Sequence, residues 1–139
     1  MFESLINRLR GQPAEPPLPE PDEHLALGAL LVRLARSDAN YHALEIGEID
    51  RILAETFDLK PIPAAKMRAT CEKLEAQAPG TPDFALLIRQ NVDYPHRLEM
   101  LQAMARVILA DGTRAPEESE TLLEIEQMLG ISPDDRLPL

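Results

Sequence analysis

Apolar residues recur at intervals of three and four positions along most of the chain, which is the spacing of helices that bury one face. The pattern predicts six helices, and no stretch shows the strict alternation typical of a half-buried strand. The expected helices are 22–36, 42–57, 61 or 63 to 77, 82 to before 93, 94–110 and 116–129, with one more turn at 132–135. The sequence therefore predicts an all-α fold, a compact bundle of six to seven helices.

Residues that favour helix ends stand at several of these boundaries. Asp22 is expected to cap the first helix, because a short acidic side chain accepts a hydrogen bond from the free N–H groups of the first turn. The run Thr81-Pro82-Asp83 places a capping hydroxyl, a proline and an early acid in the order that begins a helix. Asp93 is a third candidate cap, and Gly130 is expected to end the last long helix.

The apolar positions of each helix indicate the core. A chain of 139 residues with 45% hydrophobic residues needs neither a disulfide nor a metal to fold. The expected core residues are Leu25, Leu27, Leu30, Leu31, Leu34, Leu44, Ile49, Ile52, Leu53, Phe84, Leu87, Ile88, Leu98, Leu101, Met104, Val107, Ile108, Leu122, Ile125 and Leu129.

The first 21 residues differ from the rest, so we expect two parts: a tail over 1–21 and a helical domain over 22–139. An amphipathic segment at the start of the tail carries four apolar side chains at helical spacing. They are Phe2, Leu5, Ile6 and Leu9. Five prolines between 13 and 21 favour an extended spacer. The tail either contacts a membrane or a partner, or it frays or docks on its own domain, since so short a helix is marginal in water.

The composition excludes some partners and favours others. The net charge is −10, which argues against nucleic-acid binding, because that binding depends on Lys and Arg meeting phosphates. An acidic surface suits a cation or a basic protein partner. The single cysteine, Cys71, allows no intrachain disulfide, and neither a signal peptide nor a transmembrane run is recognisable. We therefore expect a cytoplasmic protein.

Two segments, 31–53 and 104–126, repeat one unit at an offset of 73 residues. In each copy an apolar helix ends at an aspartate, and a glutamate follows seven residues later in the first turn of the next helix. The aligned pairs are Asp38 with Asp111 and Glu45 with Glu118. Two such helical hairpins, paired by an internal two-fold, would form a compact core.

The two acidic turns have two interpretations. A glutamate in a first turn is favoured by the helix dipole, whereas an aspartate at a helix C-terminus is not, so something is expected to offset its charge. In one interpretation Asp38 and Asp111 accept hydrogen bonds from backbone N–H groups and cap the turns. In the other the carboxylates bind a hard cation, with Asn40 or Thr113 adding an oxygen ligand. The spacing is not that of an EF-hand loop.

At these residues the chain resembles a known family. The segments ARSDANYHALEIGEIDRIL and ILADGTRAPEESETLLEI resemble the paired A-x-A-D-G-x₅-E segments of the tellurite-resistance protein B (TerB-like) family, and the resemblance covers about residues 22–132. A related domain occurs in a DnaJ-like membrane co-chaperone. The resemblance implies an all-helical bundle linked to stress resistance and to multiprotein complexes near the inner membrane, without catalytic activity. It also implies a metal site, with calcium the usual suggestion. Its residues are Asp38 and Glu45 in the first copy, and Asp111, Gly112 and Glu118 in the second.

The first copy departs from the family pattern at Ala39, where the family has glycine. Alanine resists the positive φ that glycine tolerates, so the second copy fits the implied metal site better than the first. Asn40 could take over the left-handed conformation.

No catalytic motif is recognisable, so we expect a protein that is not an enzyme. Cys71 lacks the surroundings of a nucleophile and suggests a small core residue, and the histidines form no metal-binding pattern. They are His24, His42 and His96. The favoured function is a stress-linked module whose acidic turns bind a divalent cation, Ca²⁺ before Mg²⁺ or Zn²⁺, or a protein partner. The alternative is a metal-independent adapter, similar to a co-chaperone or attached peripherally to the inner membrane.

Overall fold

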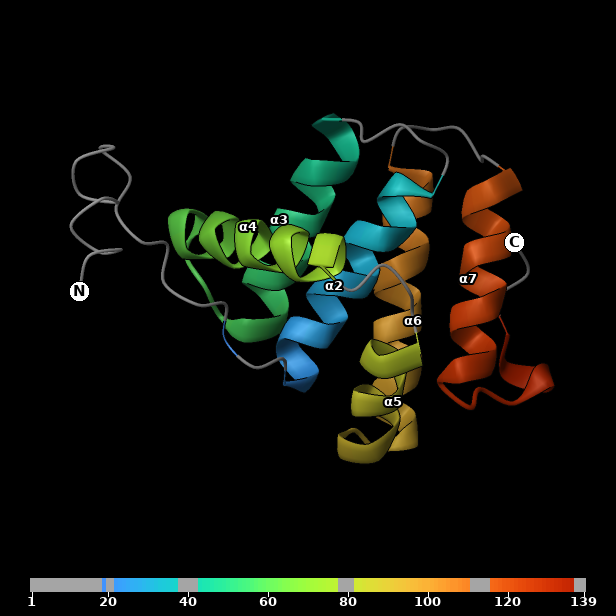
Figure 1. Ribbon diagram of the computed structural model, residues 1–139. Helices are drawn as coiled ribbons and strands as arrows, with labels where there is room; N and C mark the ends of the chain where they lie inside the picture. Colours follow the sequence, from blue (N-terminus) through green and yellow to red (C-terminus); the bar gives the residue numbers. More distant parts are fainter. Residues whose placement is uncertain (1–18, 20–21, 38–42, 78–81, 111–115, 137–139) are drawn as a thin grey trace, which may run out of the picture.

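A computed structural model describes residues 19, 22–37, 43–77, 82–110 and 116–136 as a bundle of helices (Figure 1). The helices are α2 (Glu23–Arg36), α3 (Ala43–Phe57), α4 (Pro61–Gln77), α5 (Pro82–Asn91), α6 (Tyr94–Leu109) and α7 (Pro116–Met128), followed by the 3-10 helix η1 (Pro133–Asp135). The predicted all-α fold is confirmed over these residues, and each expected helix lies close to its predicted range. The two-fold relation between the two repeats stays a prediction.

Helix α2 lies at the centre of the bundle and contacts all five of the other α-helices that the structure describes. Its buried residues follow one another almost without a break: Ala26, Leu27, Gly28, Ala29, Leu30, Leu31, Val32, Leu34 and Ala35. A helix that is apolar on all sides belongs inside a protein, whereas a surface helix has one apolar stripe. The small side chains among these residues let neighbouring helices approach α2 closely.

The helix ends confirm the capping predictions that fall on described residues. The side chains of Asp22 and Asp93 each accept a hydrogen bond from the backbone N–H three residues later, over 2.9 Å and 3.1 Å. Gly130 has a φ of 71°, the left-handed conformation that ends α7. The predicted cap at Thr81 lies outside the described residues.

One predicted core residue is wrong. Leu44 is 63% exposed, because the next residue, Glu45, lies on the side of α3 that faces the core. Residues four or seven positions apart lie on the same face of a helix. Position 45 is four residues before Ile49 and seven before Ile52. Glu45 therefore occupies the inward position, and Leu44 is turned outward. The other expected core residues are buried or packed against the core.

Helices α2 and α4 meet at a glycine and a cysteine. The structure leaves no room for a Cβ at Gly28, because it would lie 2.3 Å from the Sγ of Cys71. The thiol of Cys71 is fully buried and lies 3.6 Å from the carbonyl oxygen of Leu25, to which it can donate a hydrogen bond. Burial raises the pKa of Cys71 to about 12, with smaller contributions from the charges of Asp22 and Glu72. The thiol is therefore protonated at neutral pH and serves as packing, as the sequence predicts.

Ion pairs join α4 to α2 and α3 on the outside of the core. Arg68 donates to Asp50 over 2.5 Å and to Glu72 over 2.7 Å. Arg36 lies 3.7 Å from Glu72 and 3.6 Å from Glu75. Partly exposed pairs of this kind add little stability one by one, but shared partners fix the relative position of three helices.

The last described segment is fastened to the beginning of α6. The hydroxyl of Tyr94 donates to Asp135 over 2.7 Å and accepts from the backbone N–H of Ser132 over 2.9 Å. The guanidinium of Arg97 donates to the carbonyl of Leu129 at the end of α7. These contacts hold η1, which the sequence predicts as one more turn, against the bundle.

Candidate functional site

The helix ends that adjoin the two predicted acidic turns gather at one end of the bundle. Figure 1 shows the C-terminal ends of α2 and α6 and the N-terminal ends of α3 and α7 at the top of the view. The predicted turns at 38–42 and 111–115 connect these ends in sequence. The N-terminus of a helix favours negative charge, so two of the four ends are suited to carboxylates.

A glutamate is buried in the first turn of each of these two helices. Glu45 of α3 is 0% exposed, and Glu118 of α7 is 1% exposed. Glu118 is buried for the same reason as Glu45. It lies four residues before Leu122 and seven before Ile125, which are both buried, so it shares their face of α7. This spacing is visible in the sequence and could have identified both glutamates as buried. Taking a carboxylate out of water is costly, so the same burial in two helices calls for interactions that offset the cost.

The aspartates of the predicted site, Asp38 and Asp111, lie outside the described residues, as do Asn40 and Thr113. Among the residues that the structure does describe, no three His, Cys, Asp or Glu side chains are grouped so as to hold a metal ion. The cation site at the acidic turns therefore stays a prediction.

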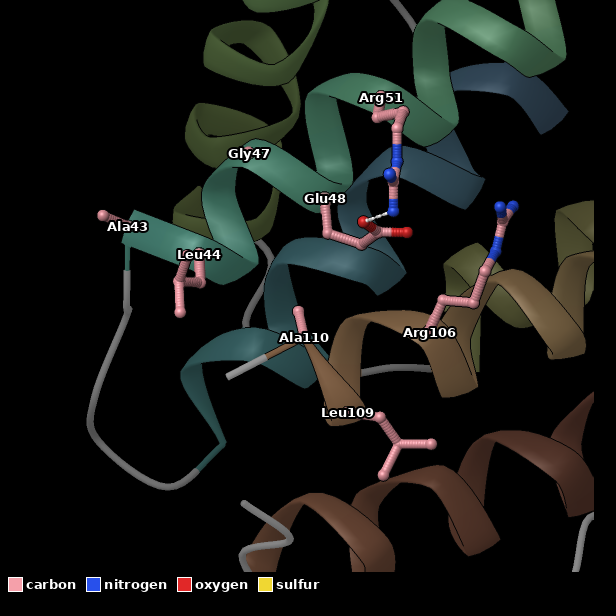
Figure 2. Close-up of a pocket in the computed structure, with 8 residues that line it drawn as sticks. All are labelled: Ala43, Leu44, Gly47, Glu48, Arg51, Arg106, Leu109 and Ala110. Carbon is pink, nitrogen blue, oxygen red and sulfur yellow. Dashed lines mark hydrogen bonds and ion pairs between the residues drawn. The ribbon is translucent and has the colours of Figure 1, made fainter. Parts of the chain in front are cut away.

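A pocket of about 530 Å³ opens beside these helix ends, between the first turns of α3 and the last turn of α6. We call it the α3/α6 pocket, and Figure 2 labels the residues from 43–51 and 106–110 that line it. Two of them adjoin the acidic turns directly, since Ala43 follows residues 38–42 and Ala110 precedes residues 111–115. Sequence reasoning did not find this pocket, because α3 and α6 are far apart in the chain.

The α3/α6 pocket combines apolar and charged side chains. Leu44 is 63% exposed and Leu109 is 49% exposed. Between them and Arg51 lies Glu48, which is only 8% exposed and accepts a hydrogen bond from Arg51 through Oε2 (Figure 2). Its other oxygen, Oε1, is buried and has no hydrogen-bond partner among the residues that the structure describes. Arg106 faces the same space and lies 3.4 Å from Glu55.

A smaller pocket of about 300 Å³ lies near the other end of α2, and two of the histidines line it. The ring of His24 packs on Phe57 with 4.5 Å between centroids, and His96 contacts Asp93. Both histidines are exposed, whereas His42 lies outside the described residues.

We expect the pKa of His96 to be above its ordinary value of 6.5, because Asp93 accepts a hydrogen bond from the ring and adds a negative charge. Since the folded pKa is the higher one, this contact stabilises the fold below pH 6.5 and loses its effect as the pH rises through the folded value. An NMR titration of the ring protons measures the shift. In Asp93→Asn, which keeps a good helix cap, the pKa should fall back. An unchanged pKa would show that the contact is not the cause.

The predicted membrane or partner contact through the tail lies outside the described residues, and with it Phe2, Leu5, Ile6 and Leu9. In the part of the chain that is described, no helix combines the length and the apolar character needed to cross a membrane.

The chain matches the model of a known family. The family model of the tellurite resistance protein TerB matches residues 24–137, which include both repeats and the helix ends at the candidate site. No curated protein and no solved structure matches the chain. Because the family match extends over most of the sequence, and because the fold is the helical bundle that the resemblance implied, the chain belongs to the TerB family.

Proposed function

We propose that this protein is a non-enzymatic binding module of the tellurite-resistance type, in which the two acidic turns bind a divalent cation, Ca²⁺ in preference to Mg²⁺ or Zn²⁺. The observation that carries the proposal is the burial of Glu45 and Glu118 at equivalent positions of α3 and α7. Both helices begin at the same end of the bundle, directly after the predicted turns that contain Asp38 and Asp111 (Figure 1).

The chemistry of these residues fits a hard cation. The proposed ligands are the carboxylates of Asp38, Glu45, Asp111 and Glu118, all of them oxygen donors, with backbone carbonyls of the turns in addition. Oxygen ligands are what Ca²⁺ and Mg²⁺ prefer, while zinc sites in proteins usually include nitrogen or sulfur. A bound cation would also offset the cost of a negative charge at the C-terminal ends of α2 and α6.

The second candidate function is a metal-independent adapter for a protein partner. The α3/α6 pocket favours it, because two exposed leucines border the same opening, and apolar surface of this kind commonly marks a contact site. In this case Asp38 and Asp111 would only cap their turns.

Thermal unfolding with chelator and with calcium separates the two. A cation that binds only the folded chain adds roughly 2.7 kcal/mol at a hundred times its Kd. We expect calcium to raise the Tm of the wild type and to leave the Tm of Asp111→Asn unchanged. Asp83→Asn, which removes an exposed acid from the first turn of α5, should respond like the wild type.

The adapter function predicts a different pattern. Calcium would then leave the Tm of every variant unaltered, and Asp111→Asn would change stability little, because asparagine caps a turn about as well as aspartate. A calcium effect of equal size in Asp111→Asn and Asp83→Asn would indicate weak binding to general surface charge and would refute the proposed site.

A further inference from the structure

The exposed face of α4 carries positive charge and no negative charge. Its exposed positions, with the residue before the helix, include Lys60, Lys66 and Lys73, and no exposed position of this fully described helix is acidic. These are all the lysines of a chain whose net charge is −10. The acids that α4 places close to the bundle, Glu72 and Glu75, pair there with arginines of α2 and α4. The helix therefore separates its charges and leaves the lysines for a partner outside the chain.

This positive face lies apart from an acidic face of the bundle. Helix α7 exposes Glu117, Glu120 and Glu124, and Figure 1 shows α4 and α7 on opposite sides of the bundle. Exposed charges are largely screened beyond about 8 Å at physiological ionic strength. A negatively charged surface that approaches α4 therefore meets the lysines rather than the net charge of the chain. Asp58, two residues before Lys60, is exposed and weakens this attraction.

The beginning of α4 is an exposed apolar tip. Ile62 is 71% exposed, the highest value among the large apolar side chains that the structure describes. A helix leaves its first four N–H groups without a partner inside the helix. Here Ala64 makes the first bond, to the carbonyl oxygen of Lys60 over 3.0 Å, and Pro61 and Pro63 carry no N–H at all. The tip thus exposes fewer backbone donors than an ordinary helix end, which lowers the cost of leaving water.

The lysines and the tip can touch one flat surface together. Ile62, Lys66 and Lys73 lie on a single stripe of α4, because residues four, seven and eleven positions apart share a face of a helix. Lysine is a mobile point charge that needs no fixed partner geometry, so it suits an array of phosphate headgroups. An acidic peptide satisfies the lysines alone. An anionic bilayer also offers the apolar boundary into which Ile62 can insert.

We propose that α4 is a docking face for an anionic lipid bilayer, in which the three lysines contact headgroups and Ile62 enters the apolar boundary beneath them. The proposal goes beyond cation binding, since it uses no residue of the acidic turns. Binding is therefore expected in chelator, and a failure of the cation site would not remove it.

Flotation of the full chain with lipid vesicles in chelator tests the proposal. We expect the chain to bind vesicles made of equal parts phosphatidylglycerol and phosphatidylcholine, and not vesicles of phosphatidylcholine alone. The combined variant Lys66→Gln with Lys73→Gln should weaken binding by about tenfold or more, because each lysine near an anionic surface adds to the affinity. Ile62→Ser should weaken it several-fold, and Asp58→Asn should strengthen it.

Matched controls are available on α5. Arg89→Gln removes an exposed cation and Leu86→Ser an exposed apolar side chain, so both should bind as the wild type does. The tail is present in every variant, so its contribution is constant, and circular dichroism should show that all variants are folded.

Three outcomes would overturn the proposal. The first is no binding to the anionic vesicles. The second is equal binding by the wild type and the α4 variants, since another surface would then make the contact. The third is tighter binding to polyglutamate than to the vesicles without any effect of Ile62→Ser, which would assign the face to an acidic protein segment instead.

Discussion

Replacing Gly28 with alanine is expected to destabilise the fold by about 2 kcal/mol, although alanine is the better helix former. The new Cβ would lie 2.3 Å from the Sγ of Cys71 and 3.2 Å from its Cβ. Both residues are inside helices, and Cys71 is fully buried, so neither can move away without shifting α2 against α4. Chemical denaturation of the variant and the wild type measures the difference.

Two further variants show whether the close contact is the cause. Gly47 is also inside a helix, but a Cβ there would meet nothing within 4 Å. Gly47→Ala should therefore be neutral or stabilising by up to about 1 kcal/mol. Cys71→Ala removes the sulfur atom from the contact and should recover much of the loss when combined with Gly28→Ala. If Gly28→Ala were as harmless as Gly47→Ala, the packing of α2 on α4 described above would be wrong.

The second large effect is expected from Leu31→Ala, with a loss of about 3 kcal/mol. Leu31 is fully buried on α2, the helix that contacts all the other described α-helices. The cavity left by the truncation would collapse only in part, because several helices would have to shift together to fill it. For a chain of this length the loss should lower Tm by roughly 10 °C.

The control for this prediction is Leu86→Ala on α5. Leu86 is 49% exposed, so its truncation should change the free energy of unfolding by less than about 0.5 kcal/mol. A small loss from Leu31→Ala, similar to that from Leu86→Ala, would contradict the central position of α2.

Much of the fold could be predicted because its signals are local. Asp22 and Asp93 cap helices through N–H groups three residues away, and Gly130 ends α7 through its own φ. These interactions depend on a few neighbouring residues, so the sequence shows them directly. The apolar spacing likewise identified most of the large core residues, but it placed Leu44 among them and left out others, such as Leu74 of α4.

The error at Leu44 shows the limit of assigning burial by hydrophobicity alone. The spacing of Ile49 and Ile52 places Glu45 inward, and a polar residue there is buried despite its charge. Glu45 and Glu118 are ligand candidates from the sequence, but hydrophobicity alone does not predict their burial.

The α3/α6 pocket could not be predicted, because it forms where two helices meet that are separate in the sequence. Arg106 and Glu55, which pair across this contact, are 51 residues apart. The approach of α3 to α6 depends on how both pack around α2, and local patterns carry no information on that arrangement.

The most direct test of the central claim is a backbone-amide NMR titration of chelator-stripped protein with Ca²⁺, followed by Mg²⁺ and Zn²⁺. Cation binding at the acidic turns predicts saturable shifts at residues 37–45 and 111–118. These shifts should be lost in Asp38→Asn and in Asp111→Asn. Flat or non-saturating shifts at millimolar calcium would contradict the claim and would leave both aspartates as caps of their turns.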